Sequence, residues 1–498
     1  MTGRAAARRA ARDRDERLAA AGDGTPAVVL KLDPNVMHHG GLGVIRSLGR
    51  MGVPVYGVHE SRLAPAAGSR YLRGRCVWRP GADDAERIRD GLLALAGRIG
   101  RPAVLLPTDD AGAIFLAEHG ADLRPWFIFP DQPAGLAREV AGKFSLHQLC
   151  ARLGVPAAAA VVPGSDGEAR DFGAIAGYPL IAKLTEPWQD GTSAGAAPGA
   201  AAGHVSLPST SVIADQAGLD DAYRAATAAG AGLMLQEFIP GGPGADWFFH
   251  GYCDAACACR PAFTGVKERS YPAHAGLTSL GRAEPNPELR DQVTDLLGEL
   301  GYRGILDMDL RRDSRDGQYK LLDFNPRLGA QFRLFQTTAG VDVARAAYLD
   351  LTGATVPAGE PEPGRRYLVE SYDPLGALGY WRRGELSARG WLASMRSVDE
   401  VAWFAADDLR PFGLMCLRMG WRLASRPAGR LAGLLPGGPA PRNPGRQPRF
   451  LPGRAARRAG LGMTSHSDAA SAASERPVPA PEITRRPAPL SSKEGARA

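Results

Sequence analysis

The N-terminal part of the chain alternates short apolar runs with amphipathic segments, a pattern typical of a parallel sheet covered by helices. Apolar runs predict buried strands at 27–32, 55–58 and 103–106. A glycine-rich turn at 39–43 leads into a predicted helix at 44–51, and a second helix is predicted at 85–99. This order predicts a doubly wound α/β domain over residues 26–135.

A second pattern begins near residue 136, where helices are followed by strands that pair as hairpins. Strands are predicted at 178–184, 233–239, 304–310 and 319–325, with a hairpin-like pair between 247 and 270. Helices are predicted at 143–153, 286–301 and 341–352. We therefore expect a larger α/β domain over 136–355, followed by a small C-terminal module with strands and one helix over 356–424.

The two ends of the chain differ in composition from the middle. Residues 1–25 are rich in Arg and Ala, and residues 425–498 are rich in Pro, Gly and Arg, so both segments are predicted to be disordered. The tail holds 13 basic and four acidic residues, a balance of +9, and residues 26–424 are net negative, so the net charge of +7 comes from the ends. Because the basicity lies at the ends, it does not predict a nucleic-acid-binding fold, although a basic tail is compatible with peripheral membrane contact. Residues 190–203, rich in Gly, Ala and Ser, are predicted to be a mobile loop.

Three observations bound the class of protein. No apolar run approaches the length of a membrane-spanning helix, so none is expected. Six cysteines in 498 residues do not make a disulfide framework. The first residues lack the apolar stretch of a secretory signal, so a cytoplasmic location is the default expectation.

The most informative residues lie on the strands predicted at 304–310 and 319–325. A tight turn between them would bring Asp309 close to Asp323 and Asn325, and the last two share a face of their strand. Three oxygen ligands on one face suit a hard cation such as Mg²⁺, and Arg327 follows within reach of a phosphoryl group. Alternatively, these polar residues only end a strand and begin a turn.

Other residues point to the same chemistry. Lys143 opens a predicted helix, and Lys183 lies inside an apolar strand, where a lysine is costly unless it meets an anion. Residues 236–239, Gln-Glu-Phe-Ile, end another strand with side-chain and backbone groups that can read an adenine edge. The loop 190–203 is of a type that can fold over phosphates.

In this order, Lys143, Lys183, a small-residue loop, QEFIPGG, Asp309 and DFNPR resemble the ATP-grasp superfamily. The resemblance covers about 27–355, and GVIRSLGRMGVPVYGV resembles the opening of the pre-ATP-grasp domain of that superfamily. The stretch VKERSYPAHAGLTSLGRA and the C-terminal module resemble the D-aspartate ligase-like carboxylate–amine ligases. The implied fold is a doubly wound pre-ATP-grasp domain, a two-lobed ATP-grasp domain and a small α+β module.

The resemblance also implies roles for individual residues, with ATP and Mg²⁺ (or Mn²⁺) as cofactors. Lys143 and Lys183 would bind the ATP phosphates, with Lys183 nearest the adenine side. The adenine would be bound by Glu237, Phe238 and Ile239, and the ribose by Asp246. Metal ions would be held by Asp309, Asp323 and Asn325. The catalytic residues would be Arg327, at the γ-phosphate or intermediate, and Lys267, which with Arg269 would reach the phosphates or the substrate carboxylate.

The implied reaction is ATP-dependent amide formation through an acylphosphate, with release of ADP. Its partners would be a small-molecule carboxylate and an amine of the amino-acid or peptide class, and a homodimer is compatible with the sequence. Two departures from the family pattern leave a second reading open. Asp stands at 309 and 323, where the family often or usually has Glu, and the loop at 190–203 is long, with His204 where a Lys is often seen. The alternative is a catalytically weakened ATP-binding regulatory protein.

Several further motifs favour plain structural roles. Cys253, Cys257 and Cys259 lack zinc-site spacing and are expected in the core. The adjacent His38 and His39 are expected to be polar loop residues, and the glycines at 40, 41 and 43 favour a tight turn over the dinucleotide site of an oxidoreductase. The sequence does not decide whether Arg46 contacts substrate or has a structural role. Residues 411–435 favour a last packed helix over an interfacial amphipathic helix.

Overall fold

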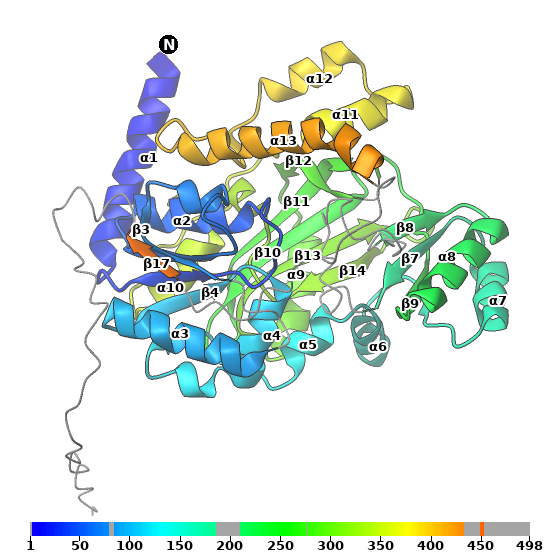
Figure 1. The fold of residues 1–498 in the computed structure, drawn as a ribbon, viewed down its shortest axis with the longest axis horizontal. Helices are drawn as coiled ribbons and strands as arrows, with labels where there is room; N and C mark the ends of the chain where they lie inside the picture. Colours follow the sequence, from blue (N-terminus) through cyan, green and yellow to red (C-terminus); the bar gives the residue numbers. More distant parts are fainter. Residues whose placement is uncertain (1, 79–83, 186–209, 275, 433–448, 453–498) are drawn as a thin grey trace, which may run out of the picture. The chain divides into compact units, whose positions relative to one another are not determined.

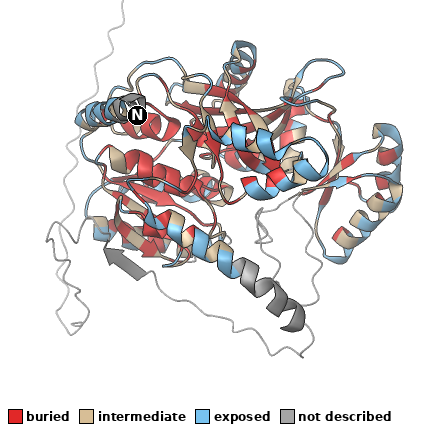
Figure 2. Ribbon diagram, turned by 90° about the horizontal axis from the view of Figure 1, so that it is seen from above, coloured by how far each residue is buried: buried red, intermediate tan, exposed pale blue. Residues whose placement is uncertain are grey.

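The structure is a computed structural model that describes residues 2–78, 84–185, 210–274, 276–432 and 449–452. All of these belong to the unit Met1–Gly460, whereas Leu461–Ala498 lies outside the described residues. Three β-sheets with helices packed on them make up the described unit (Figure 1). Its buried residues concentrate in the sheets and on the helix faces that meet them (Figure 2). The predicted α/β class is therefore confirmed.

A six-stranded sheet forms mainly from the N-terminal region, in the order β17-β3-β2-β1-β4-β5. Its parallel strands are β1 (Ala27–Leu30), β2 (Val55–His59), β3 (Leu72–Val77), β4 (Ala103–Pro107) and β5 (Phe127–Ile128). Every residue of β1 is buried because helices cover both faces of the sheet. Ala27 and Val29 pack with α2 (Gly40–Arg50), and Val28 and Leu30 pack with α3 (Ala85–Ile99).

The second sheet has seven strands in the order β14-β13-β10-β11-β12-β15-β16. Its strands are β10 (Asp246–Cys253), β11 (Cys259–Tyr271), β12 (Leu277–Ala283), β13 (Gly304–Arg312), β14 (Tyr319–Asn325), β15 (Arg366–Leu368) and β16 (Glu400–Val401). All neighbours pair antiparallel except β15 and β16. Phe248 packs in the core that contains α10 (Val343–Leu351), and Phe249 packs in the core that contains α9 (Pro287–Glu299), so helices cover both faces.

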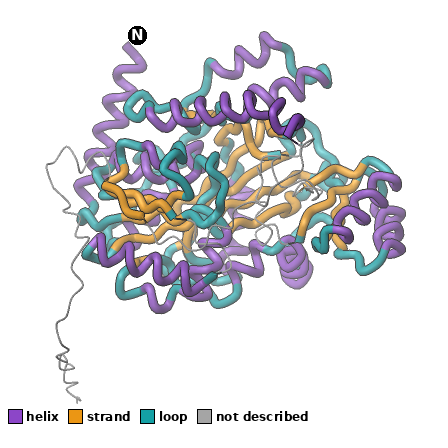
Figure 3. The backbone as a smooth tube through the Cα atoms, in the orientation of Figure 1, coloured by secondary structure: helices purple, strands orange, loops and turns teal. Residues whose placement is uncertain are grey.

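The third sheet has four antiparallel strands in the order β6-β9-β7-β8. They are β6 (Ala160–Val161), β7 (Leu180–Leu184), β8 (Thr210–Ile213) and β9 (Leu233–Glu237). Helices α7 (Asp166–Ala176) and α8 (Gln216–Ala228) pack on this sheet around a small core of its own (Figure 3). Helix α4 (Asp110–His119) connects β4 to β5 within the first sheet, and the helices α5 (Leu136–Ala141) and α6 (Lys143–Leu153) follow β5 before the chain enters the third sheet.

The C-terminal region differs from the predicted small module with one helix. It contains three helices, α11 (Asp373–Arg382), α12 (Ala388–Met395) and α13 (Arg410–Ala432). Its strands β15 and β16 extend the seven-stranded sheet, because β15 pairs with the edge of β12. Helix α13 packs against the N-terminal region, where Leu414 contacts Gly68. The expectation that 411–435 begins a packed last helix is thus met over its described part.

The ends of the chain also differ from the predictions. The lead expected to be disordered contains helix α1 (Thr2–Ala21), whose Leu18 is buried and whose Asp15 lies 2.7 Å from Arg345. In the tail, α13 continues to Ala432, and β17 (Arg449–Pro452) pairs antiparallel with the edge strand β3. Distant ion pairs and a sheet edge provide the partners that the local composition does not reveal. The predicted mobile loop at 190–203 lies outside the described residues.

None of the described helices is both long enough and apolar enough to cross a membrane.

Candidate active site

A patch of four polar side chains lies on neighbouring strands β13 and β14. Asp309 is opposite Asp323 in the register, and Asp307 is opposite Asn325. The register shifts between Asp309 and Leu310, where β14 carries an extra residue. Because of this bulge, the polar patch and the apolar Leu310–Leu321 pair lie on opposite faces of the strands. The predicted proximity of Asp309, Asp323 and Asn325 is therefore what the structure shows.

Two lysines from different elements converge on Asp323. The Nζ atom of Lys143, at the start of α6, donates to Asp323 Oδ1 at 2.8 Å. Lys183, on β7 of the four-stranded sheet, donates to the same oxygen at 3.4 Å and to the carbonyl of Leu322 at 3.2 Å. These contacts connect the four-stranded and seven-stranded sheets, and they satisfy the sequence argument that a lysine in an apolar strand needs an anionic partner.

The pKa values of Asp323, Lys143 and Lys183 are shifted in different directions. Burial would raise the pKa of Asp323, but Lys143 and Lys183 outweigh it and hold the pKa well below its ordinary value. Burial lowers the pKa of Lys183, an effect that Asp323 opposes and Lys143 reinforces. Burial would also lower the pKa of Lys143, but attraction to Asp323 outweighs burial and raises it. One carboxylate thus serves two cations, and the pair of lysines carries surplus positive charge.

Lys267 on β11 forms a second contact with the patch. Its Nζ atom lies 3.6 Å from Asp309 Oδ1. Burial raises the pKa of Asp309, Lys267 opposes that shift, and the neighbouring carboxylates of Asp307 and Asp323 reinforce it. The Oδ1 atom of Asp309 is buried and accepts no hydrogen bond from the described residues. An oxygen in this state is a candidate ligand for a cation.

Arg327 joins the patch to the N-terminal domain. Its guanidinium donates to Asn325 Oδ1 at 2.9 Å and to Asp307 Oδ2 at 3.1 Å, and its Nε lies 3.2 Å from Asp110 Oδ1. Burial would lower the pKa of Arg327, but the attraction of Asp110 and Asp307 outweighs burial, so the pKa lies above its ordinary value. The arginine is thus held in place, fully charged, by carboxylates from two distant parts of the chain.

Three residues of this cluster are absent from the sequence predictions. Asp307 is buried, and its Oδ1 atom lies 3.0 Å from Nε2 of the fully buried His250 on β10. Asp110 begins α4, next to Asp109, which caps that helix. The alternation rule offered one signal, because Asp307 precedes Asp309 by two positions and must share its face. His250 and Asp110 could not be found from local sequence. The partner of His250 is Asp307 and that of Asp110 is Arg327, and both partners lie far away in the chain.

The residues predicted at adenine and ribose form a separate group at the end of β9. Glu237 accepts from the backbone of Ala159 at 3.0 Å and from Arg315 at 3.0 Å. Arg311 donates to the carbonyl of Ile239 at 2.7 Å, pairs with Asp246, and lies 5.5 Å from the ring of Phe238. Arginine contacts that the sequence did not indicate hold these residues in place. Their roles at adenine and ribose stay predictions.

Arg269 is not with the cluster, contrary to the prediction. Its guanidinium forms a buried, two-point ion pair with Asp373 at 2.9 and 3.1 Å and donates to Ser394. The ladder between β11 and β12 shifts register on either side of Arg269. The alternation from Lys267 therefore does not continue to Arg269.

The donor set suits a hard cation. Asp307, Asp309, Asp323 and Asn325 offer carboxylate and amide oxygens, the ligands that Mg²⁺ prefers, and Asp309 Oδ1 has no described hydrogen-bond partner. Within the described ranges, no group of three or more His, Cys, Asp or Glu side chains is arranged so that it could hold a metal by itself. A cation here would therefore need the amide of Asn325 and oxygens from a bound anion as well.

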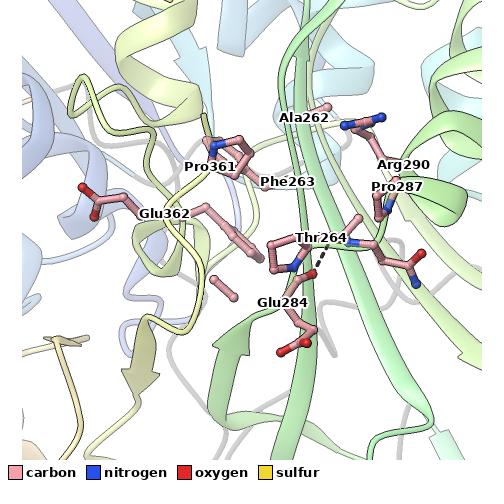
Figure 4. Close-up of a pocket in the computed structure, with 12 residues that line it drawn as sticks. Ala262, Phe263, Thr264, Glu284, Pro287, Arg290, Pro361 and Glu362 are labelled. Carbon is pink, nitrogen blue, oxygen red and sulfur yellow. Dashed lines mark hydrogen bonds between the residues drawn. The ribbon is translucent and has the colours of Figure 1, made fainter. Parts of the chain in front are cut away.

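Two cavities lie away from this cluster. One has a volume of about 40 Å³ and is lined by residues such as Phe263, Thr264 and Arg290, with Thr264 donating to the carbonyl of Glu284 at 2.6 Å (Figure 4). It is too small for a nucleotide. The other, of about 540 Å³, is lined by Met308, Leu310 and Leu321 and so lies on the face of β13 and β14 opposite the polar patch. Neither contains a predicted site residue.

Of the three cysteines expected in the core, Cys253 and Cys259 lie in or against it, whereas Cys257 is half-buried in the connection between β10 and β11. Cys253 and Cys259 are register partners at the apolar core, and Arg46 forms a buried ion pair with Asp408 at 3.1 Å, which settles its role as structural. The glycines at 40, 41 and 43, predicted to form a tight turn before a helix, instead form the first turn of α2. His39 differs from the expected polar loop residue, because it is buried against Tyr367 and Trp403.

Comparison with known proteins identifies similar chains. No family model matches. The chain is 29% identical to a D-aspartate ligase of Enterococcus faecium (strain Aus0004) over 115 residues, which are 23% of this chain and 27% of that protein. The match thus spans about a quarter of the curated relative. It confirms the resemblance to D-aspartate ligase-like, ATP-grasp carboxylate–amine ligases that the motifs predict.

Two solved structures are also similar. The chain is 12% identical to N5-carboxyaminoimidazole synthetase from Staphylococcus aureus, covering 69% of this chain and 81% of that one with a TM-score of 0.47. It is 16% identical to the biotin carboxylase domain of Hydrogenobacter thermophilus 2-oxoglutarate carboxylase, covering 68% and 71% with a TM-score of 0.46.

Proposed function

We propose that the chain is an ATP-dependent, ADP-forming ligase that joins a carboxylate to an amine. The observation that carries the proposal is the patch of oxygen ligands on β13 and β14, surrounded by Lys143, Lys183, Lys267 and Arg327. Acidic ligands inside a ring of fixed cations suit a polyphosphate bound together with a divalent cation. The similarity to a D-aspartate ligase supports the same class.

In this proposal the nucleotide lies between the four-stranded and the seven-stranded sheet, as in a two-lobed ATP-grasp domain. Lys143 and Lys183 bind phosphate oxygens, because they are the cations that reach from α6 and the smaller sheet toward the patch. Glu237 and the backbone of Phe238 and Ile239 form the adenine end. Asp246 lies on the strand that follows them, at the ribose.

Asp309, Asp323 and Asn325 are the proposed ligands of Mg²⁺, with Asp307 as a further candidate that faces Asn325. When bound, the metal would supply positive charge that neutralises the charge developing during phosphoryl transfer. The side chains do the positioning. Asp307 and Asp110 orient Arg327, whose guanidinium is then aimed at the transferred phosphoryl group.

The reaction has two steps. A substrate carboxylate oxygen attacks the γ-phosphorus, the bond to the β-phosphate oxygen breaks, and ADP leaves with that electron pair. The amine then attacks the acyl carbon, the carbon–oxygen bond to phosphate breaks, and inorganic phosphate leaves as the nitrogen loses a proton to solvent. Lys267 and Arg327 stabilise the charge on the acylphosphate oxygens in both steps.

The test is ADP release from the full chain with ATP and Mg²⁺, against pooled amino acids and dipeptides. We expect ADP with certain pools only, and none from Asp323→Ala or Asn325→Ala. Asp295→Ala, which removes an exposed carboxylate on α9, is the matched control and should retain activity. ATP binding without turnover in any pool would favour the catalytically weakened alternative. Absence of ATP binding would contradict both readings.

A further inference from the structure

Helices α11 and α12 expose an unusual number of large apolar side chains. Leu375, Leu378 and Trp381 on α11 and Leu392 and Met395 on α12 are all exposed, with Trp381 at 58% and Leu392 at 56%. Among helices whose side chains the structure describes, α11 has three such residues, and α12 has two, as does the part of α13 up to Trp421. We refer to residues 373–396 as the α11–α12 segment.

Arginines accompany these apolar residues at helical spacing. On α11, Leu375, Leu378 and Arg382 are spaced by three and four positions, and at α12, Arg389, Leu392 and Arg396 repeat that spacing. Residues at this spacing share one helix face. The segment therefore presents the same arrangement twice, with apolar side chains and guanidinium groups on the outward face of each helix.

This surface carries a net positive charge. Arg382, Arg383, Arg389 and Arg396 are all exposed, and within the part of the chain that the structure describes none forms an ion pair. Of the two acids of the segment, Asp373 is buried against Arg269, and Glu385 lies 2.7 Å from His274. Asp373 is neutralised by Arg269, and Glu385 can offset one of the four arginines, so the surface keeps a net positive charge.

We propose that the outward face of the α11–α12 segment binds an anionic lipid bilayer, with its leucines and tryptophan in the interfacial region and its arginines at the lipid phosphates. A helix that lies on a membrane combines a basic polar part with Leu and Trp on the inserted face, and each basic residue near an anionic surface adds to binding. Tryptophan is suited to this depth because one end of its ring is apolar and the other polar.

Charge distinguishes a bilayer from a second copy of the chain. In a two-fold dimer the same patch would meet itself, so the four arginines of one copy would oppose four in the other. Like charges in an interface are repulsive. A surface of lipid phosphates supplies the opposite charge, and its acyl region accepts the leucines.

The segment is firmly attached beside the candidate active site. Asp373 accepts from Arg269 and from the ring nitrogen of Trp391, and the Tyr380 hydroxyl accepts from the backbone nitrogen of Ser270 at 3.3 Å. Both Arg269 and Ser270 belong to β11, the strand that carries Lys267. Membrane binding would therefore hold the protein with this strand toward the lipid surface.

The experiment is flotation of the full chain with vesicles of phosphatidylcholine alone, or of phosphatidylcholine mixed with anionic phosphatidylglycerol. The test variant is Arg389→Ala/Leu392→Ala. The matched control is Arg260→Ala/Ile175→Ala, which also removes one exposed arginine and one apolar residue, the latter 87% exposed. We expect binding to the anionic vesicles, reduced roughly tenfold in the test variant and unchanged in the control.

The parent chain, the test variant and the control variant all keep the basic tail. If vesicles bound through the tail alone, the test variant would bind as well as the control, and this result would overturn the proposal. Equal binding to both vesicle types would also overturn it. So would concentration-dependent dimerisation that only the test variant loses, because the face would then be a contact between copies. Binding to a short RNA but not to vesicles would assign the arginines to a nucleic acid instead.

Discussion

Asp323 offers the sharpest perturbation of the site, because it is the counter-ion of two lysines. In Asp323→Asn, the amide keeps the shape but leaves Lys143 and Lys183 without a negative partner at 2.8 and 3.4 Å. Breaking a buried ion pair costs about 3–5 kcal/mol, and an exposed one about 0–1 kcal/mol. Asp323 is 28% exposed and the lysines are less exposed. We therefore expect the free energy of unfolding to fall by about 2 kcal/mol.

The assay is thermal unfolding of the full chain, followed by the same measurement with inorganic triphosphate in EDTA. A loss of about 2 kcal/mol should lower Tm by roughly 2–4 °C, because the entropy of unfolding grows with the size of the folded unit. In the parent protein Asp323 competes with phosphate oxygens for the two lysines. The variant should therefore bind metal-free triphosphate roughly tenfold more tightly, and its Tm should rise more on addition of the ligand.

Asp295→Asn is the control, since Asp295 is exposed and forms no ion pair with a described residue. Equal triphosphate affinity in Asp323→Asn and the parent would refute the idea that these lysines face the nucleotide. The pH dependence gives an independent check. Because the folded pKa of Asp323 is lowered, its contribution to stability is complete above its unfolded pKa of about 3.9 and is lost as pH falls through the folded value. The difference between variant and parent should accordingly shrink below about pH 4.

Single contacts elsewhere in the structure give three further tests. Arg327→Lys should retain ATP binding but lower kcat at least roughly tenfold, because lysine cannot keep the two-point contact with Asn325 and Asp307; single-turnover ADP formation measures this. Gly43→Ala would place a methyl group 2.7 Å from the ring of Phe332 and should cost about 1–3 kcal/mol in urea unfolding. Arg46→Met should cost about 3–5 kcal/mol by leaving Asp408 buried without its cation, and Arg46→Met/Asp408→Leu should recover much of the loss in the same assay.

Local patterns predicted the bounds of several elements to the residue. The helices predicted at 85–99 and 143–153 have those bounds in the structure, and the strand at 319–325 does too. Lys183 was visible for the same local reason, because it interrupts an apolar strand. A single charged residue in such a run points to a partner without identifying it.

What the sequence could not show depends on long-range pairing. Arg46 and Asp408 are 362 residues apart, and no local signal distinguishes Arg46 from a surface or substrate-binding residue. The short strand β17 forms only because β3 offers an open edge. The misplacement of Arg269 has a similar cause, since strict alternation from Lys267 fails at a register shift.

A bulge also explains why the candidate site is built on β13 and β14. In a regular strand Leu321, Asp323 and Asn325 would share one face, and the core would lose Leu321 or accept two polar side chains. The extra residue at the Asp309–Leu310 shift lets Leu321 remain in the core while Asp323 and Asn325 turn to Lys143 and Arg327. A strand that reads as ordinary in sequence thus supplies both the core and the ligands, and the fold places their cationic partners from other elements around them.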